Sequence, residues 1–236
     1  MIKRIINSFR EIKWLYKCSG SKVRVLTGSI FTVASDVRIL NSTVFVNRDS
    51  SLTLSEGVVL SGVNLYVKGH VTIGEHTHLS DGDYTIDGGC LIVGHHSKLT
   101  LRRIWVRFGG IVEIGDYTNI NARSEIRSDE SVQIGSYCQI SYDINIWDTN
   151  THNIYPAEKR RAIAKKYWPY FGKETERPAT KPIVIGNDCW IGEKASILKN
   201  TTLGDGTIVG YNTLVSNRTI PAGSKVIQKS ELTIIQ

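Results

Sequence analysis

Long hydrophobic runs are missing from this chain of 236 residues. No apolar stretch approaches the ~20 residues that a membrane-spanning helix needs, so the sequence predicts no transmembrane segment. The first seventeen residues contain apolar side chains, but Lys3, Arg10 and Glu11 interrupt them and no small-residue cleavage site follows. This pattern does not indicate a secretion signal, and we expect a cytoplasmic protein.

Cysteine is also scarce. The four cysteines share no short spacing of the metal-binding kind. In a long chain without a secretion signal, four thiols do not imply a disulfide framework. The sequence therefore predicts free, mostly buried thiols.

Positive charge exceeds negative charge, and the formal net charge is +7. A basic chain favours an anionic partner, which can be nucleic acid, a membrane surface, a phosphorylated cofactor or an acidic saccharide. The basic residues are not interleaved with aromatic residues on one readable face, so we expect no nucleic-acid partner.

Residues 2–17 place apolar side chains at helical spacing and basic side chains largely elsewhere around the cylinder. The pattern predicts a basic amphipathic helix within an N-terminal segment, residues 1–20. Such a helix either caps the open end of a β-structure or lies on an anionic membrane surface as a peripheral contact. The sequence alone leaves both roles open.

A six-residue period governs the C-terminal part of the chain. The repeating aliphatic residues are Ile185, Ile191, Ile197, Leu203, Val209 and Val215. Two positions before the next aliphatic residue the side chain is compact, as in Cys189, Ala195, Thr201, Thr207 and Thr213. This period fits neither an α-helix nor an alternating strand, but it fits one flat side plus its turn. Three such sides close a coil of about 18 residues, and successive coils stack at the strand spacing of ~4.8 Å.

The same signature continues upstream in two triplets, which are Ile114, Ile120, Ile126 and Ile134, Ile140, Ile146. The fold class is therefore all-β, a parallel β-helix that we expect over residues 21–222. A loop insertion interrupts it at residues 147–182, with a short basic helix expected between Tyr155 and Tyr167, and residues 223–236 form a C-terminal tail.

His152 lies at the start of the insertion, six residues after Ile146, where the next interior aliphatic residue would have fallen. An imidazole with a near-neutral pKa can take a proton from an attacking hydroxyl group or amine. Asp148 or a backbone carbonyl group can hold the other ring nitrogen. His152 is the candidate catalytic base, and Asp148 is the candidate that orients it.

The stretch from Ile134 to Tyr155, followed after the loop by the hexad Trp190-Ile191-Gly192, resembles the hexapeptide-repeat O-acetyltransferases of the galactoside and maltose acetyltransferase type. The resemblance covers about residues 112–221. It implies a left-handed helix, a homotrimer with active sites between subunits, acetyl-CoA as the acyl donor, His152 as general base and no required metal.

The resemblance also assigns binding residues. The donor channel would be lined by Trp190, Gly192, Tyr211 and Ser216, and the acceptor would be contacted by Asn121 and Asp129. The family commonly has a lysine at the place of Asn217, which this chain lacks. Contacts with the donor phosphates are therefore assigned to Arg218, Lys225 or Lys229.

The expected reaction is acetyl transfer to a hydroxyl group of a sugar or of a cell-surface polysaccharide precursor. Three alternatives stay open. One is N-acetylation of a nucleotide-linked amino sugar, in which Asp148 or Asp143 would assist the histidine. Another is a solenoid that binds a saccharide without catalysis. The third is a metal bound between subunits by His76 and His96, which are 20 residues apart.

Overall fold

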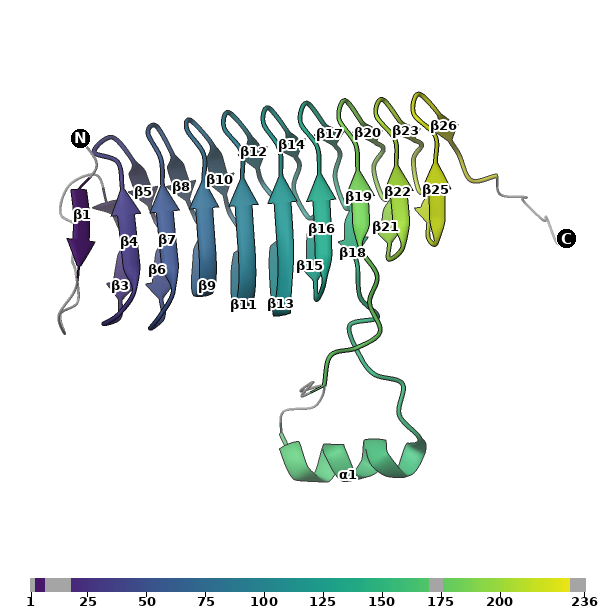
Figure 1. Cartoon of the computed structure of the whole chain (residues 1–236), viewed down its shortest axis with the longest axis horizontal. Coiled ribbons are helices and arrows are strands. Elements are labelled where there is room, and N and C mark those ends of the chain that lie inside the picture. The colour runs from purple at the N-terminus through teal and green to yellow at the C-terminus, as the bar shows by residue number, and fades with distance from the viewer. Residues whose placement is uncertain (1–2, 7–17, 170–175, 230–236) are drawn as a thin grey trace, which may run out of the picture.

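The computed structural model describes residues 3–6, 18–169 and 176–229. These residues form a parallel β-solenoid of about 10 turns (Figure 1). Each complete turn places strands on three flat sides. The first side is a 10-stranded sheet, and the second and third sides belong together to a 16-stranded sheet. The predicted all-β parallel solenoid is confirmed.

The strands are named here side by side. The first side holds β2 (Cys18–Ser19), β5 (Arg38–Leu40), β8 (Val59–Ser61), β10 (His78–Ser80), β12 (Lys98–Leu99), β14 (Asn119–Ile120), β17 (Gln139–Ile140), β20 (Trp190–Ile191), β23 (Ile208–Val209) and β26 (Lys225–Val226). The second side holds β3 (Lys22–Val25), β6 (Thr43–Val46), β15 (Glu125–Ser128), β18 (Asn145–Trp147), β21 (Ser196–Leu198) and β24 (Leu214–Val215). The third side holds β4 (Ile30–Val33), β7 (Ser51–Leu54), β16 (Ser131–Ile134), β19 (Ile183–Ile185), β22 (Thr201–Leu203) and β25 (Arg218–Ile220).

Three long strands run across the corner from the second side to the third. They are β9 (Asn64–Ile73), β11 (Asp83–Val93) and β13 (Arg103–Ile114). The pairing between β11 and β13 shifts register between Asp87 and Gly89, which marks a bulge at this corner. Gly89 has φ +130°, and a Cβ atom there would lie 2.1 Å from the carbonyl oxygen of Gly110. The backbones approach too closely at this corner for any side chain.

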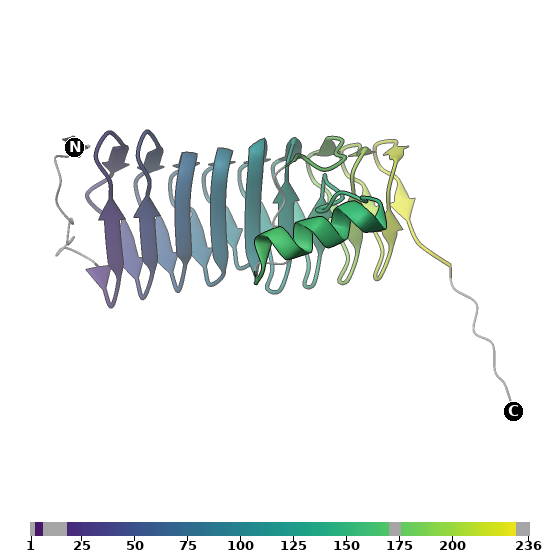
Figure 2. The ribbon, with the colours of Figure 1, turned by 90° about the horizontal axis from the view of Figure 1, so that it is seen from below.

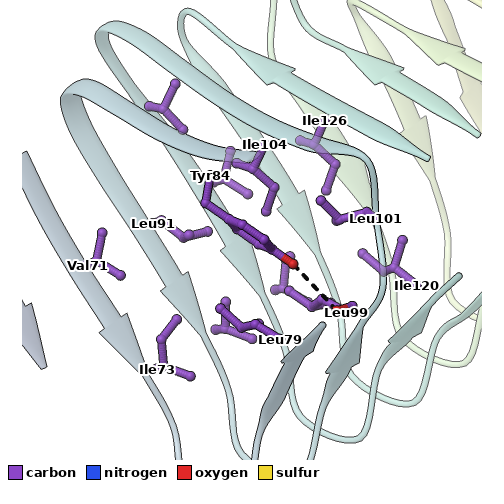
Figure 3. Packing of buried hydrophobic residues seen from close by; sticks show 14 of the residues in the cluster. Val71, Ile73, Leu79, Tyr84, Leu91, Leu99, Leu101, Ile104, Ile120 and Ile126 are labelled. Carbon is purple, nitrogen blue, oxygen red and sulfur yellow. Dashed lines mark hydrogen bonds between the residues drawn. The ribbon is translucent and has the colours of Figure 1, made fainter. Parts of the chain in front are cut away.

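The interior is a column of aliphatic side chains. As the predicted coil of about 18 residues requires, aliphatic residues 18 positions apart pair in register, namely Ile185 with Leu203, Ile191 with Val209 and Ile197 with Val215. Figure 3 shows the middle of the column, where the buried Tyr84 lies among aliphatic residues and its hydroxyl group donates to the Leu99 carbonyl oxygen at 3.4 Å. Burial raises the pKa of the Tyr84 hydroxyl group.

The N-terminal prediction was wrong over the four residues that can be compared. Lys3–Ile6 form strand β1, which pairs antiparallel with β4, and not a helix. An uncovered first strand would leave its backbone donors and acceptors unpaired, and the pairing satisfies one edge of it. The remainder of the predicted helix lies outside the described residues. At the other end, strand pairing continues to Val226, past the predicted boundary at residue 222.

The insertion holds the helix α1 (Ala157–Tyr167), as the sequence predicts. The loop leaves the corner between the second and third sides, and α1 lies well clear of the solenoid body (Figure 1). Seen from below, α1 runs roughly along the long axis of the solenoid (Figure 2). None of its residues is buried. Within the described ranges, no helix is long and apolar enough to span a membrane.

Candidate active site

The base of the insertion is a short two-stranded stalk. Thr149 and Thr180 form an antiparallel bridge. The backbone amide of Asn150 donates to the carbonyl oxygen of Ala179 at 2.9 Å. The backbone amide of Lys181 donates to the carbonyl oxygen of Asp148, also at 2.9 Å. The two arms of the loop are therefore tied together where they leave the solenoid.

His152 follows directly after this stalk. Its backbone amide donates to the carbonyl oxygen of Asn150 at 2.7 Å, and Thr151 before it is buried with φ +68°. The imidazole is exposed. An exposed ring on a backbone held from both sides can meet a substrate without large movement of the main chain.

Asp148 is buried and holds the preceding corner of the coil. Its carboxylate accepts hydrogen bonds from the Ser128 hydroxyl group at 2.8 Å and from the amides of Asp129 at 2.8 Å and Glu130 at 2.9 Å. Burial raises the pKa of this carboxyl group, although the three hydrogen bonds act in the opposite direction. Its oxygen atoms hold the 128–130 turn, and the role of Asp148 in orienting the imidazole stays a prediction.

Asp129 is buried as well, at 1% exposure. Arg107 donates to both of its oxygen atoms, and the Thr149 hydroxyl group donates to one of them at 2.6 Å. A buried carboxylate needs such partners because desolvation of its charge is costly. In this chain Asp129 joins the solenoid to the loop, and its predicted contact with an acceptor stays untested.

Asn121 and Asp143 lie at a different corner, between the first and second sides. The side-chain oxygen of Asn121 accepts a hydrogen bond from the side-chain amide nitrogen of Asn119 at 3.2 Å. Asp143 accepts two hydrogen bonds from Arg123 at 2.8 and 2.7 Å, and this pairing lowers the pKa of its carboxyl group. Within one chain, neither residue is brought to His152.

The candidate donor residues fall into two groups. Trp190 on β20 and Tyr211 at the corner after β23 are 60% and 62% exposed. Lys194 donates to the Tyr211 hydroxyl group at 3.0 Å. Gly192 lies beneath this corner, where a Cβ atom would come within 2.8 Å of the Tyr211 amide nitrogen. These residues and the exposed Lys225 on β26 form the first group, on the first side and its corner.

The second group lies on the corner that carries the loop. Ser216 and Arg218 occupy this corner two turns beyond the loop base, and Arg218 is exposed. One turn below them, Lys199 hydrogen-bonds to the side-chain oxygen of Asn150 in the stalk. Lys229 lies outside both groups, since it follows β26 at the end of the solenoid, and it is exposed. In a single chain, the His152 corner and the Trp190 side are therefore different faces of the solenoid.

The network around Arg107 escaped prediction. The available signal was spacing, since Arg107 precedes Asp129 by 22 residues, about one turn. Two other pairs of opposite charge at this interval, Arg123 with Asp143 and Lys68 with Asp87, also form ion pairs. Burial of the first pair depends on the loop packing over it, which sequence spacing does not encode.

His76 and His96, the alternative metal ligands, belong to a row of rings with Tyr117 and Tyr137, in which the His76 ring is tilted and the other three are stacked. Neighbouring ring centroids are 4.9 to 5.2 Å apart. In the part of the chain that the structure describes, no three His, Cys, Asp or Glu side chains are grouped to hold a metal ion.

Residues 182–217 match the family model "Bacterial transferase hexapeptide (six repeats)". The chain is 28% identical over 126 residues to "Putative lipopolysaccharide biosynthesis O-acetyl transferase WbbJ" of Escherichia coli. This alignment covers 51% of this chain and 61% of that protein. It is 28% identical over 147 residues to "Probable acetyltransferase Rv3034c" of Mycobacterium tuberculosis, which covers 60% of this chain and 43% of that protein. Both alignments span less than two thirds of the relative's length.

Among solved structures, the polySia specific acetyltransferase NeuO matches with a TM-score of 0.56 and 20% identity. The match covers 90% of this chain and 82% of NeuO. At this identity the similarity shows a shared solenoid fold.

Proposed function

We propose that this hexapeptide-repeat protein transfers an acetyl group from acetyl-CoA to a hydroxyl group of a saccharide, with His152 as general base. The observation that carries the proposal is the placement of His152. It is an exposed imidazole on a stalk tied by hydrogen bonds to the solenoid, at the position where the aliphatic repeat is broken.

His152 would accept the proton of the acceptor hydroxyl group as that oxygen attacks the thioester carbonyl carbon. General base catalysis of this kind typically contributes about 100- to 10,000-fold. The carbon–sulfur bond then breaks, and the proton held by His152 can be returned to the leaving thiolate. A backbone amide near the stalk would stabilise the negative charge on the carbonyl oxygen.

Donor binding is assigned to residues of two faces. Trp190 and Tyr211 offer exposed aromatic surface. Gly192 lies at the same corner, where the backbone of the next coil comes too close for a side chain, so that the corner can present Tyr211. Arg218, Lys225 and Lys229 are exposed cations suited to phosphate groups. The Ser216 hydroxyl group is a further candidate contact.

Because Trp190 and His152 occupy different faces of one chain, the proposal requires a neighbouring copy to complete the site. A homotrimer, in which the first side of one subunit faces the loop corner of the next, would meet this requirement. Asn121, which lies at the edge of the same side two coils before Trp190, could then face the acceptor across the subunit boundary. The side chain of Asp129 is buried in this chain.

A saccharide acceptor is supported by the name of one relative, a lipopolysaccharide biosynthesis O-acetyl transferase. We extend this to a hydroxyl group of a sugar or of a cell-surface polysaccharide precursor. N-acetylation is less well supported, because Asp148 and Asp143, the carboxylates that would assist it, are both engaged elsewhere. For location we propose the cytoplasm, with peripheral membrane contact through residues 2–17, most of which lie outside the described residues.

The test is release of free coenzyme A thiol from acetyl-CoA with paired acceptors that differ only in a hydroxyl or an amino group at one carbon. The proposal predicts release with the hydroxyl sugar. Faster release with the amino sugar would instead indicate N-acetylation. No release together with no calorimetric binding of coenzyme A would indicate a saccharide-binding solenoid.

A further inference from the structure

A row of outward-facing side chains runs along the second side of the solenoid, one from each successive strand. In register they are Phe45, Tyr66, Thr85, Trp105, Arg127 and Trp147. We call this the aromatic row. The insertion begins directly after Trp147, so the last aromatic residue of the row lies at the base of the stalk that holds His152. The next residue in register is Leu198.

The row has a gap at Thr85. Phe45 and Tyr66 are stacked, with ring centroids 5.5 Å apart and ring planes 3° from parallel. Phe45 therefore covers one face of Tyr66, and the other face is directed along the row toward Trp105. Neighbouring strands are about 4.8 Å apart, so the two strands that carry Tyr66 and Trp105 are separated by about 9.6 Å.

A depression of about 460 Å³ lies over this part of the row. It is lined by Tyr66, Thr85 and Trp105 and reaches past Tyr66 to Phe45 and Thr43. We call it the Thr85 slot. Polar side chains of the adjacent register line its edge, namely Asn64, Asp83 and Arg103. The side-chain amide of Asn64 donates to Asp83 at 3.0 Å, and Arg103 is 40% exposed.

We propose that the Thr85 slot binds one pyranose ring of a saccharide acceptor. A ring midway between the two walls, Tyr66 and Trp105, would lie about 4.8 Å from each, which is within the range of stacking distances for aromatic rings. The apolar C–H faces of the sugar would pack against Tyr66 and Trp105. Its hydroxyl groups would meet the donors and acceptors on the polar edge.

The charges at the slot favour an uncharged ring. Asp83 and Arg103 carry opposite charges on the same edge, so the edge offers both donors and acceptors without an excess of either sign. Nearer the loop, the guanidinium group of Arg107 lies 4.2 Å from the centroid of Trp105, and that of Arg127 lies 4.3 Å from the centroid of Trp147. These contacts hold the aromatic side chains in place.

The slot lies at a useful distance from the proposed catalytic base. Three strand steps separate Thr85 from Trp147, or about 14 Å along the row. An oligosaccharide of a few units that lies along the row can therefore occupy the slot at one end and reach the stalk at the other. This assignment rests on the proposed function, because it makes the slot a distal subsite for the acceptor.

The decisive variant is Thr85→Trp, which fills the slot without removing any wall. Thr72→Trp is the matched control, because Thr72 is an outward-facing threonine on the third side. Binding of three hexasaccharides, one neutral, one N-acetylated and one acidic, is followed by saturation-transfer NMR. Transfer kinetics are measured with each hexasaccharide and with its monosaccharide, and coenzyme A binding is measured by calorimetry.

The proposal predicts that the wild type binds at least one hexasaccharide and that Thr85→Trp weakens this binding about tenfold or more, as expected for loss of two stacking contacts. The hexasaccharide KM should rise by a similar factor, while monosaccharide transfer and coenzyme A binding stay unchanged. Thr72→Trp should match the wild type in all measurements.

Three results would overturn the slot. They are unchanged hexasaccharide binding in Thr85→Trp, no binding of any hexasaccharide by the wild type, and a loss of coenzyme A affinity in Thr85→Trp alone. The last result would mean that the slot holds the adenine base of the donor. If the wild type binds hexasaccharides through the slot but never releases thiol, the slot stands and the transferase proposal fails.

Discussion

Arg107 donates two hydrogen bonds to Asp129, at 2.9 and 2.8 Å, and both side chains are buried beneath the base of the insertion. Arg107 also donates to the carbonyl oxygen of Thr151 at 3.2 Å, one residue before His152. The guanidinium group of Arg107 therefore contacts a coil of the solenoid, the base of the insertion and the ring of Trp105. It links the scaffold to the residue that directly precedes the proposed catalytic base.

Replacement of Asp129 by Asn should destabilise the protein strongly. Removal of one partner from a buried ion pair leaves the other charge uncompensated and typically costs about 3–5 kcal/mol. For a chain of this size, this corresponds to a fall in Tm of roughly 6 to 20 °C, measured by circular dichroism or calorimetry. Asp143→Asn, which breaks the exposed pair with Arg123, is the matched control and should change Tm little. Similar shifts for the two variants would contradict this interpretation.

Glu125 should make the stability depend on pH in the acid range. Burial alone would raise the pKa of its carboxyl group, but Arg127 and Arg102 outweigh burial, and the pKa is lowered from its ordinary value of 4.5. Because the carboxyl group is more acidic in the folded chain, it stabilises the fold at neutral pH. This contribution is lost as the pH falls from about 4.5 through the lower folded-state value.

The measurement for Glu125 is the Tm of the wild type and of Glu125→Gln between pH 7 and pH 3. The wild type should be more stable at pH 7, and the difference should shrink as the pH falls below 4.5. A constant difference over the whole range would show that the loss comes from packing and not from the carboxylate charge.

Two neighbouring corner glycines should respond differently to alanine. A Cβ atom at Gly89 would lie 2.1 Å from a backbone oxygen, whereas one at Gly109 would meet nothing within 4 Å, although φ is positive at both. Gly109→Ala should cost about 1 kcal/mol for backbone conformation alone. Gly89→Ala should cost several times more or prevent folding. Equal costs, measured by denaturant unfolding, would show that the close approach of the coils adds nothing.

The architecture was readable from the sequence because one residue type repeats at a fixed interval. The aliphatic ladder from Ile185 to Val215 fixes the side length, and the compact residues two positions before each rung fix the turns. The helix α1 was predicted because the insertion departs from the six-residue pattern and carries a run of basic residues between Tyr155 and Tyr167.

Side-chain roles were harder to predict, because they depend on which faces the coil brings together. Asp129 and Asp148 looked available for chemistry, but the stalk packs over them and forces both to find buried partners. Strand β1 was mistaken for a helix since Ile5 and Ile6 continue the helical spacing of residues 2–17. Pairing with the edge of β4 outweighed this local pattern. The Thr85 slot has no signal in one stretch of sequence, because its walls are 39 residues apart.

The central claim is that His152 is the base of an acetyl transfer reaction. The most direct measurement is acceptor-dependent release of thiol from acetyl-CoA by the wild type, by His152→Ala and by His78→Ala, with Tm and coenzyme A binding determined for each. His78 is an exposed histidine on β10 of the first side and serves as the control. The account predicts a loss of about 100-fold or more in kcat for His152→Ala, with intact fold and donor binding, and near wild-type activity for His78→Ala. A His152→Ala variant that transfers acetyl groups as fast as the wild type would contradict the account.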